Sequence, residues 1–136
     1  MKHEQALALV PNGTASPASF GGTWRNELGS VMTLRVKGNV VTGRYTSKVS
    51  SSHKNVSGPI SGFVNGYTVS FVVRWPMPSL TAWVGQLATE RGREVIETLW
   101  QLTRQVENPE DAAELWNSVN CGADRFRRVA RRKRGR

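Results

Sequence analysis

Five tryptophans and a hydroxyl-rich segment are the residues of this sequence with the chemistry to hold a small ligand. The tryptophans are Trp24, Trp75, Trp83, Trp100 and Trp116. Each brings a large apolar ring and an N–H donor that needs a partner when it is buried. Hydroxyls cluster at Thr46 and Ser47 and again at 50–52, on either side of Val49. Core packing would explain any single tryptophan, and a solvated loop would explain the serine run alone.

Catalytic and metal-binding chemistry has little support in the sequence. The 136 residues include one cysteine, Cys121, and two histidines, His3 and His53. A single cysteine cannot build an internal disulfide framework, and two histidines do not make a metal-ligand cluster. The sequence also lacks a phosphate-binding glycine loop with its lysine, a GxSxG elbow and an HExxH helix. We therefore predict a protein that is not an enzyme and that uses no cofactor and no metal.

The net charge of +9 is concentrated at one end of the chain. Residues 125–136 hold eight of the 19 lysines and arginines and no acid, which leaves 11 bases against ten acids in residues 1–124. A basic terminal run beside a nearly neutral body is typical of a solvated tail. Binding of a polyanion by this run is the alternative.

Short strands are the elements that must position the candidate residues. From Gly21 onward, apolar residues alternate with polar ones in short runs separated by turn residues, which is typical of an all-β domain. Tight hairpins are predicted at 37–39, at 65–66 and at 91–92, where glycine or asparagine tolerates a positive φ. The predicted strands are 22–27, 31–37, 40–49, 58–63, 67–75, 80–89, 93–105 and 122–129.

The phase of two strands predicts what they bury. In 67–75 the odd positions from Tyr67 to Trp75 are all apolar, so we expect that face inside. In 93–105 both faces carry apolar residues, which indicates a subunit interface on the outside. Eight sequential antiparallel strands close most economically as an up-and-down β-barrel, with a two-sheet sandwich as the rival. Residues 106–116 break the pattern and predict a loop with one helical turn.

Three segments are predicted along the chain. Residues 1–20 have no helical or strand period and are expected to form a flexible arm, 21–129 the barrel, and 130–136 a basic tail. No run of apolar residues is long enough for a membrane-spanning helix, and the opening apolar run is too short for a secretory signal. We therefore expect no membrane association and no export signal within this sequence.

Six segments, in order along the chain, resemble the avidin and streptavidin family of biotin-binding proteins. The resemblance runs from about Gly21 to Val129, so it covers nearly the whole predicted domain. It implies an eight-stranded barrel that holds biotin in its mouth. The segments are GTWRNELGSVMTL at 22–34, GRYTSKVSSS at 43–52, FVVRW ending at Trp75, SLTAWVGQ at 79–86, EVIETLWQL at 94–102, and Trp116 followed by Asp124.

The resemblance implies a polar set for the cyclic urea of biotin. Asn26, Ser30 and Tyr45 would donate to the ureido oxygen. Ser47 and Asp124 would accept from the two ureido N–H groups. A carboxylate acceptor makes a charge-assisted bond of roughly 1.5–3 kcal/mol, against about 0.5–1.5 kcal/mol for a neutral one. Asp124 is therefore the polar residue expected to matter most.

The rest of the implied site meets the sulfur, the carboxylate and the ring faces. Thr81 would face the ring sulfur, while Ser79 and the serine loop Ser50, Ser51 and Ser52 would meet the valeryl carboxylate. Aromatic and aliphatic walls would exclude water and strengthen the buried hydrogen bonds. These walls are Trp75, Trp83 and Trp100 with Leu28, Val49 and Leu102.

The resemblance also implies a homotetramer, a dimer of dimers, in which Trp116 completes the pocket of a neighbouring subunit. Secreted or periplasmic location is implied in the same way. Cys121 falls at a position close to a subunit two-fold axis, where either an intersubunit disulfide or a buried free thiol is possible. Pro76-Met77-Pro78 is shorter than the matching stretch of streptavidin, so contacts to the carboxylate depend on this register.

Two other functions stay open at the level of sequence. A lipocalin-like carrier of another small molecule would keep the barrel, but an apolar ligand would leave the implied polar set unpaired. A nucleic-acid-binding module would use residues 125–136 together with exposed aromatic rings.

Overall fold

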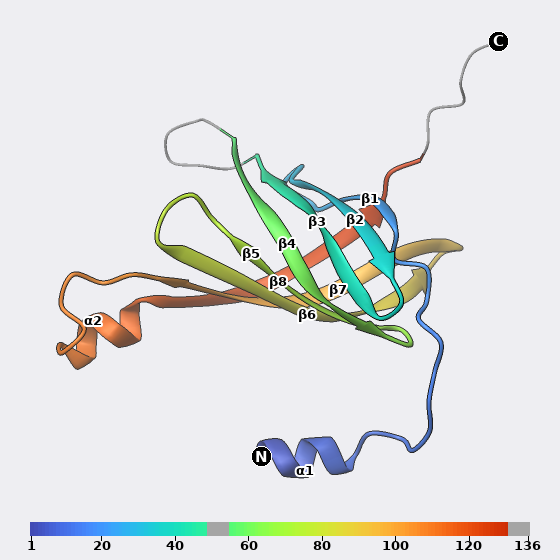
Figure 1. Cartoon of the computed structure of the whole chain (residues 1–136), viewed down its shortest axis with the longest axis horizontal. Coiled ribbons are helices and arrows are strands. Elements are labelled where there is room, and N and C mark those ends of the chain that lie inside the picture. Colours follow the sequence, from blue (N-terminus) through green and yellow to red (C-terminus); the bar gives the residue numbers. More distant parts are fainter. Residues whose placement is uncertain (49–54, 131–136) are drawn as a thin grey trace.

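A computed structural model of the chain describes residues 1–48 and 55–130. Its strands form one closed antiparallel barrel in which each strand pairs with its neighbours in sequence and β1 pairs with β8 (Figure 1). The predicted barrel is therefore confirmed and the two-sheet sandwich is wrong. The strands are β1 Gly22–Arg25, β2 Val31–Lys37, β3 Val40–Ser47, β4 Val56–Asn65, β5 Thr68–Arg74, β6 Ser79–Glu90, β7 Arg93–Arg104 and β8 Val119–Arg128.

The alternation of side chains along β5 confirms the expected phase. Val69, Phe71 and Val73 are buried in the barrel, and Ser70 and Val72 between them face outward. Tyr67 is the exception, since its side chain is 64% exposed rather than inside. It precedes the first residue of β5 and lies in the turn formed with Gly66, whose φ of 58° only glycine adopts readily.

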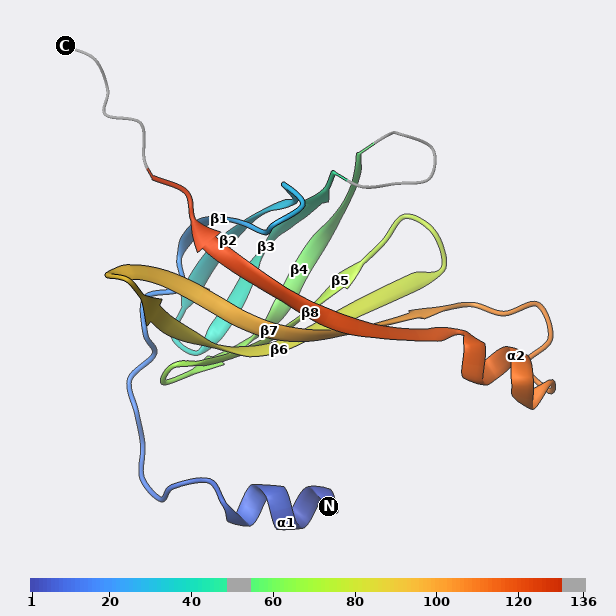
Figure 2. The same cartoon turned by 180° about the vertical axis from the view of Figure 1, so that it is seen from behind.

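Two short helices flank the barrel. The helical turn predicted within 106–116 is α2, Ala112–Asn117, and the Asp111 carboxylate caps its first turn by accepting from the backbone N–H groups of Ala113 and Glu114. The other helix, α1 His3–Ala8, lies in the arm where no helical period was recognised. It buries no residue, and it lies away from the barrel (Figure 2). Among the described residues, no helix is long and apolar enough to span a membrane.

The barrel has two different ends. The β1–β2, β5–β6 and β7–β8 connections lie at one end, called the mouth here, and the hairpins β2–β3, β4–β5 and β6–β7 lie at the other (Figure 1). The second end is closed by Phe20, which is fully buried, with Ala18 packed against the core. The packed region therefore begins before the predicted boundary at Gly21. The Ala18 N–H donates to the Gly66 carbonyl at 2.7 Å, which ties this segment to the barrel.

Trp24 and Arg128 connect the N-terminal segment to the last strand. Trp24 is fully buried, and its Nε1 donates to the Phe20 carbonyl at 2.8 Å. The Arg128 guanidinium lies 4.3 Å from the Trp24 ring centroid and donates to the carbonyls of Ser19 and Gly21. Its ion pair with Glu94, at 3.2 Å, completes the closed end. Trp24 is thus structural, as expected.

Candidate functional site

Asn26 is the first polar group of a cluster at the mouth. It follows β1, and its side-chain oxygen accepts from the backbone N–H groups of Leu28, at 3.1 Å, and Ser30, at 2.9 Å. This Asx turn fixes the side-chain amide, because the oxygen is occupied within the loop. The amide nitrogen is left to donate to the Tyr45 hydroxyl at 3.3 Å. Asn26 and Ser30 are both buried, so their hydrogen-bonding groups face the barrel interior.

Tyr45 lies on β3 between two tryptophan rings. Its ring stacks on Trp83 with centroids 4.9 Å apart and meets Trp75 edge-on at 5.7 Å. Burial raises the pKa of the Tyr45 phenol, the negative charge of Asp124 raises it further, and a hydrogen bond with the Ser30 side chain partly opposes both. The phenol therefore stays protonated at physiological pH and can donate a hydrogen bond.

Asp124 lies on β8 and belongs to the same cluster, since its carboxyl has a hydrogen bond with the Asn26 side chain. Its Oδ2 accepts from Trp83 Nε1 at 3.0 Å, and its backbone carbonyl accepts from the Thr98 hydroxyl at 2.9 Å. Burial is the main cause that raises the pKa of the Asp124 carboxyl, the Trp83 hydrogen bond opposes it, and the charge of Glu27 raises it again. A carboxylate offers about four acceptor positions, so Asp124 keeps capacity for a further donor.

Aromatic rings form the wall behind these polar groups. Trp83 stacks with both Tyr45 and Phe71, and the Phe71 ring centroid lies 5.0 Å from that of Trp83 at an interplanar angle of 16°. Trp100 is the register partner of Trp83 on β7 and also faces Gly122 of β8. A Cβ atom at Gly122 would lie 2.5 Å from the Trp100 ring, so only glycine leaves room for the indole there.

Thr81 is buried and accepts a hydrogen bond from Trp75, another tryptophan of the wall. Trp75 Nε1 donates to Thr81 Oγ1 at 2.9 Å, which leaves the hydroxyl hydrogen free to point elsewhere. Ser79 and Leu102 are half-buried nearer the rim of the mouth, and Leu102 pairs in register with Thr81. The wall and the rim therefore come from neighbouring strands of one part of the barrel.

The structure brings most of the predicted site residues to one place. Seven of them are joined by the contacts above, namely Asn26, Ser30, Tyr45, Trp75, Thr81, Trp83 and Asp124. Ser47 lies at the end of β3 next to this group and is half-buried. Leu28 lies on the β1–β2 loop, and its side chain is 68% exposed in the single chain. Val49, Ser50, Ser51 and Ser52 lie outside the described residues.

Trp116 is not part of the cluster within one chain. Trp116 lies on α2, a helix beyond the end of the barrel (Figure 2). The Trp116 side chain is 81% exposed. An indole this exposed on a short helix without buried residues has no packing role in the single chain.

Three residues of the site were missed by sequence reasoning. Phe71 has the correct phase in β5 but no polar atom to mark it. Thr98 and Glu27 contact the backbone around Asp124, from β7 and from the β1–β2 loop. For Glu27, the only available signal was its position directly after Asn26. Within residues 1–48 and 55–130, no group of three or more histidine, cysteine or acidic side chains could hold a metal ion.

The cluster can bind a planar polar group but has no evident reactive centre. The amide, hydroxyl and phenol groups of Asn26, Ser30 and Tyr45 lie next to the acceptor carboxylate of Asp124, which has a hydrogen bond with the Asn26 side chain. Stacked rings exclude water from the space behind them. A ligand that offers an acceptor next to a donor would match this arrangement.

Comparisons with known proteins point to one family. The Avidin family model matches residues 14–129. Avidin-related protein 4/5 of Gallus gallus is 33% identical over 134 residues, which cover 91% of this chain and 87% of the relative. Avidin of Gallus gallus is 31% identical over 140 residues, which cover 94% and 90%.

Solved structures agree with the sequence comparisons. Xenavidin superposes with a TM-score of 0.72 at 30% identity, with 83% of this chain and 99% of the other covered. A biotin-binding protein from chicken gives the same TM-score of 0.72 and identity of 30%, with coverage of 84% and 98%.

Proposed function

The chain belongs to the avidin family, and we propose that it binds biotin in the mouth of its barrel. Family membership identifies it as a non-enzymatic binding protein that needs no cofactor. The observation that carries the proposal is the convergence of Asn26, Tyr45 and Asp124 around Trp83. These groups come from both ends of the sequence, and a cyclic urea offers one acceptor and two donors to meet them.

The ureido group of biotin would lie between the donors and the acceptors. Asn26 Nδ2, the Ser30 hydroxyl and the Tyr45 phenol donate to the ureido oxygen, while Ser47 and Asp124 accept from the two N–H groups. The protonated phenol supports this assignment, because a phenolate could not donate. The Asx turn of Asn26 supports it as well, since the loop occupies the amide oxygen and turns the nitrogen toward Tyr45 and Asp124, where biotin would take over as acceptor.

The ring sulfur and the tail would meet the β5–β6 side of the mouth. Thr81 accepts from Trp75, so its remaining hydroxyl hydrogen can point to the sulfur. Trp75, Trp83, Trp100 and Leu102 enclose the bicyclic ring, and Ser79 meets the valeryl carboxylate. Participation of Leu28, Val49 and the serines Ser50, Ser51 and Ser52 stays a prediction.

We also propose a homotetramer, a dimer of dimers, in which Trp116 covers the site of a neighbouring subunit. The exposed ring of Trp116 supports this, because a partner would bury it. An apolar row on the outer face of the barrel offers a surface for association: Val84 is 62% and Leu99 69% exposed, and they are register partners. Cys121 is exposed in the single chain and lies on β8 beside this row. Export from the cell stays a prediction of the resemblance.

The basic run does not favour a polyanion-binding function. Two of its described arginines are engaged within the fold: Arg125 pairs with Glu90 and Glu97, and Arg128 pairs with Glu94. Guanidinium groups committed to carboxylates are poor contacts for phosphate. Binding through residues 130–136 would have to act without them.

Isothermal calorimetry with free biotin tests the proposal. We expect exothermic binding of one biotin per chain, and we expect free biotin to displace the protein from a biotinylated resin. A biotin analogue whose urea is replaced by a hydrocarbon ring serves as the control, because it keeps the shape and loses every ureido hydrogen bond. Absence of heat together with absence of displacement would disprove biotin binding.

A further inference from the structure

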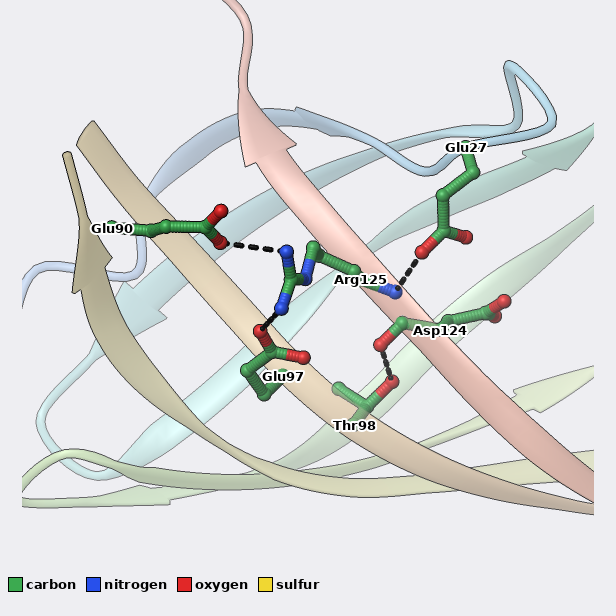
Figure 3. A network of polar contacts seen from close by, with 6 residues as sticks. All are labelled: Glu27, Glu90, Glu97, Thr98, Asp124 and Arg125. Atoms are coloured by element: carbon green, nitrogen blue, oxygen red, sulfur yellow. Dashed lines mark hydrogen bonds and ion pairs between the residues drawn. The ribbon is translucent and has the colours of Figure 1, made fainter.

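The peptide group between Asp124 and Arg125 is held at both of its polar atoms. Its carbonyl oxygen, from Asp124, accepts from the Thr98 hydroxyl at 2.9 Å. Its N–H, from Arg125, donates to Glu27 Oε1 at 3.1 Å. Figure 3 shows both contacts, with Thr98 and Glu27 on opposite sides of β8. The backbone that carries the Asp124 side chain is therefore fixed from two neighbouring elements.

The Glu27 side chain replaces a missing strand at this point. β1 pairs with β8 only at Trp24–Arg128 and Arg25–Arg127, and the strand ends at Arg25. Continuing that register by two places would put residue 27 opposite Arg125. The β1 backbone has left the sheet by then, so the Arg125 N–H would have no strand partner, and the Glu27 carboxylate accepts from it instead. A bond from a backbone N–H to a carboxylate is stronger than an ordinary ladder bond.

We propose that Glu27 is a positioning residue of the biotin site. Its carboxylate fixes the β8 backbone so that the Asp124 carboxylate meets a ureido N–H. This inference rests on the proposed function. Glu27 acts through β8, since its contact is with the peptide group that follows Asp124 and not with the cluster of donors. The same loop carries Asn26, so Glu27 also connects the loop of Asn26 to the strand of Asp124.

The charge of Glu27 has a second effect on the site. The Arg125 guanidinium is taken by Glu90 and Glu97 and makes no ion pair with Glu27. The charge that acts on the Asp124 carboxyl comes from Glu27 on the β1–β2 loop, while the Asp124 charge itself acts on Tyr45 of β3, and Glu27 also acts on Arg125. The Glu27 charge raises the pKa of Asp124, which makes the acceptor easier to protonate in acid.

Two substitutions separate the anchoring from the charge. Glu27→Gln keeps an oxygen that can accept from Arg125 N–H but removes the charge, whereas Glu27→Ala removes both. At neutral pH we expect the biotin off-rate of Glu27→Ala to rise about tenfold, and that of Glu27→Gln to stay within about twofold of the wild type. In acid we expect the off-rate of Glu27→Gln to rise at a lower pH than that of the wild type. Without the Glu27 charge the pKa of Asp124 is lower, so Asp124 stays ionised to a lower pH.

Glu97→Gln is the matched control. Like Glu27→Gln, it removes one negative charge from the surroundings of Arg125. Glu97, however, contacts the Arg125 guanidinium and not the peptide group. Its off-rate should equal that of the wild type at neutral pH. Equal off-rates for Glu27→Ala and the wild type would overturn the proposal, and so would a rise in Glu97→Gln as large as that in Glu27→Ala.

Amide hydrogen exchange without biotin gives a readout that does not depend on the proposed function. The Arg125 amide should be protected in the wild type and in Glu27→Gln, and should exchange about tenfold faster in Glu27→Ala at equal global stability. Unchanged exchange in Glu27→Ala would overturn the anchoring. If the wild type shows this protection but no biotin binding, the proposed function fails and the anchor is structural only.

Discussion

At the closed end Trp24 donates its Nε1 hydrogen to the Phe20 carbonyl, whereas near the mouth Trp83 donates the same hydrogen to the Asp124 carboxylate. The first acceptor is a backbone group in a segment that is packed on the core. The second is a side chain with acceptor positions to spare. One buried indole thus completes a seal, and the other orients a group that is ready for a ligand.

The two ends also treat charge differently. Arg128 at the closed end has an anionic partner, two carbonyls and the face of Trp24. Asp124 at the mouth has neutral donors and a nearby negative charge, and the pKa of its carboxyl is raised. The closed end therefore favours folding, while the mouth keeps a buried acid whose best partner would be an external donor. Stability and binding should respond to substitutions at different ends.

Trp24→Ala should have the largest effect, and the effect should be on the stability of the fold. Loss of a fully buried indole leaves a cavity and removes the stacking surface of Arg128, so the free energy of unfolding should drop by about 3–5 kcal/mol. Chemical denaturation without ligand measures it. Tyr67→Ala is the matched control, since this ring is 64% exposed and its loss should cost under about 0.5 kcal/mol. Equal costs for the two variants would refute the assignment of Trp24 to the seal.

Asp124→Ala should affect binding at the mouth rather than the stability of the fold. Removal of the charge-assisted acceptor should weaken biotin binding by about 1.5–3 kcal/mol, which corresponds to an off-rate raised by roughly 10- to 150-fold. Unfolding of the ligand-free protein should change much less, because the half-buried carboxylate is not a net source of stability. Displacement of a labelled biotin and denaturation of the same sample provide the two numbers. A stability loss as large as that of Trp24→Ala would contradict the division of roles.

Trp116→Ala should have a smaller effect, and only through the assembly. We expect biotin to leave about tenfold faster and the tetramer to dissociate at a higher protein concentration, because an exposed indole would be buried only by a partner. Light scattering after gel filtration gives the oligomeric state. If the off-rate is unchanged, the shared cover is wrong even though biotin may still bind.

The pH dependence of Asp124 should give the smallest effect, with opposite signs for folding and binding. The folded-state pKa is raised, so the ligand-free protein gains stability from this group as pH falls toward the ordinary aspartate value of about 3.9 and loses it as pH rises through the folded pKa. The proposed site needs the ionised acceptor to bind biotin, so the affinity for biotin should fall over the same acid window. Asp124→Asn should flatten both curves, and thermal melts and dissociation constants measured against pH would show whether it does.

Local patterns were enough to predict the strands and the hairpins. Alternation in β5 placed Phe71 inside, and Gly66 and Gly92 marked turns that require a positive φ. These features depend on neighbours in sequence, because side-chain phase and turn geometry are set within a few residues. Tyr67 was assigned to the wrong side because alternation cannot locate where a strand begins.

The proposed ligand-binding residues were identified through a resemblance to a family, and the resemblance did not predict their mutual contacts. Trp83 meets Asp124 across 41 positions, and Asn26 meets Tyr45 across 19. Such contacts depend on the register of several strand pairs at once, which no single motif specifies.

The amino-acid order by itself determined an antiparallel β-domain with aromatic rings and polar groups at particular positions. Only closure of the barrel decided that Arg128 would lie on Trp24, that Glu27 would accept from Arg125, and that Asp124 would become a half-buried acid. The Glu27–Arg125 bond joins residues 98 positions apart, at the seam where the first and last strands meet. Alternation and turn preference act over a few residues, whereas seams, ion pairs and raised pKa values arise from segments that meet only when the sheet closes.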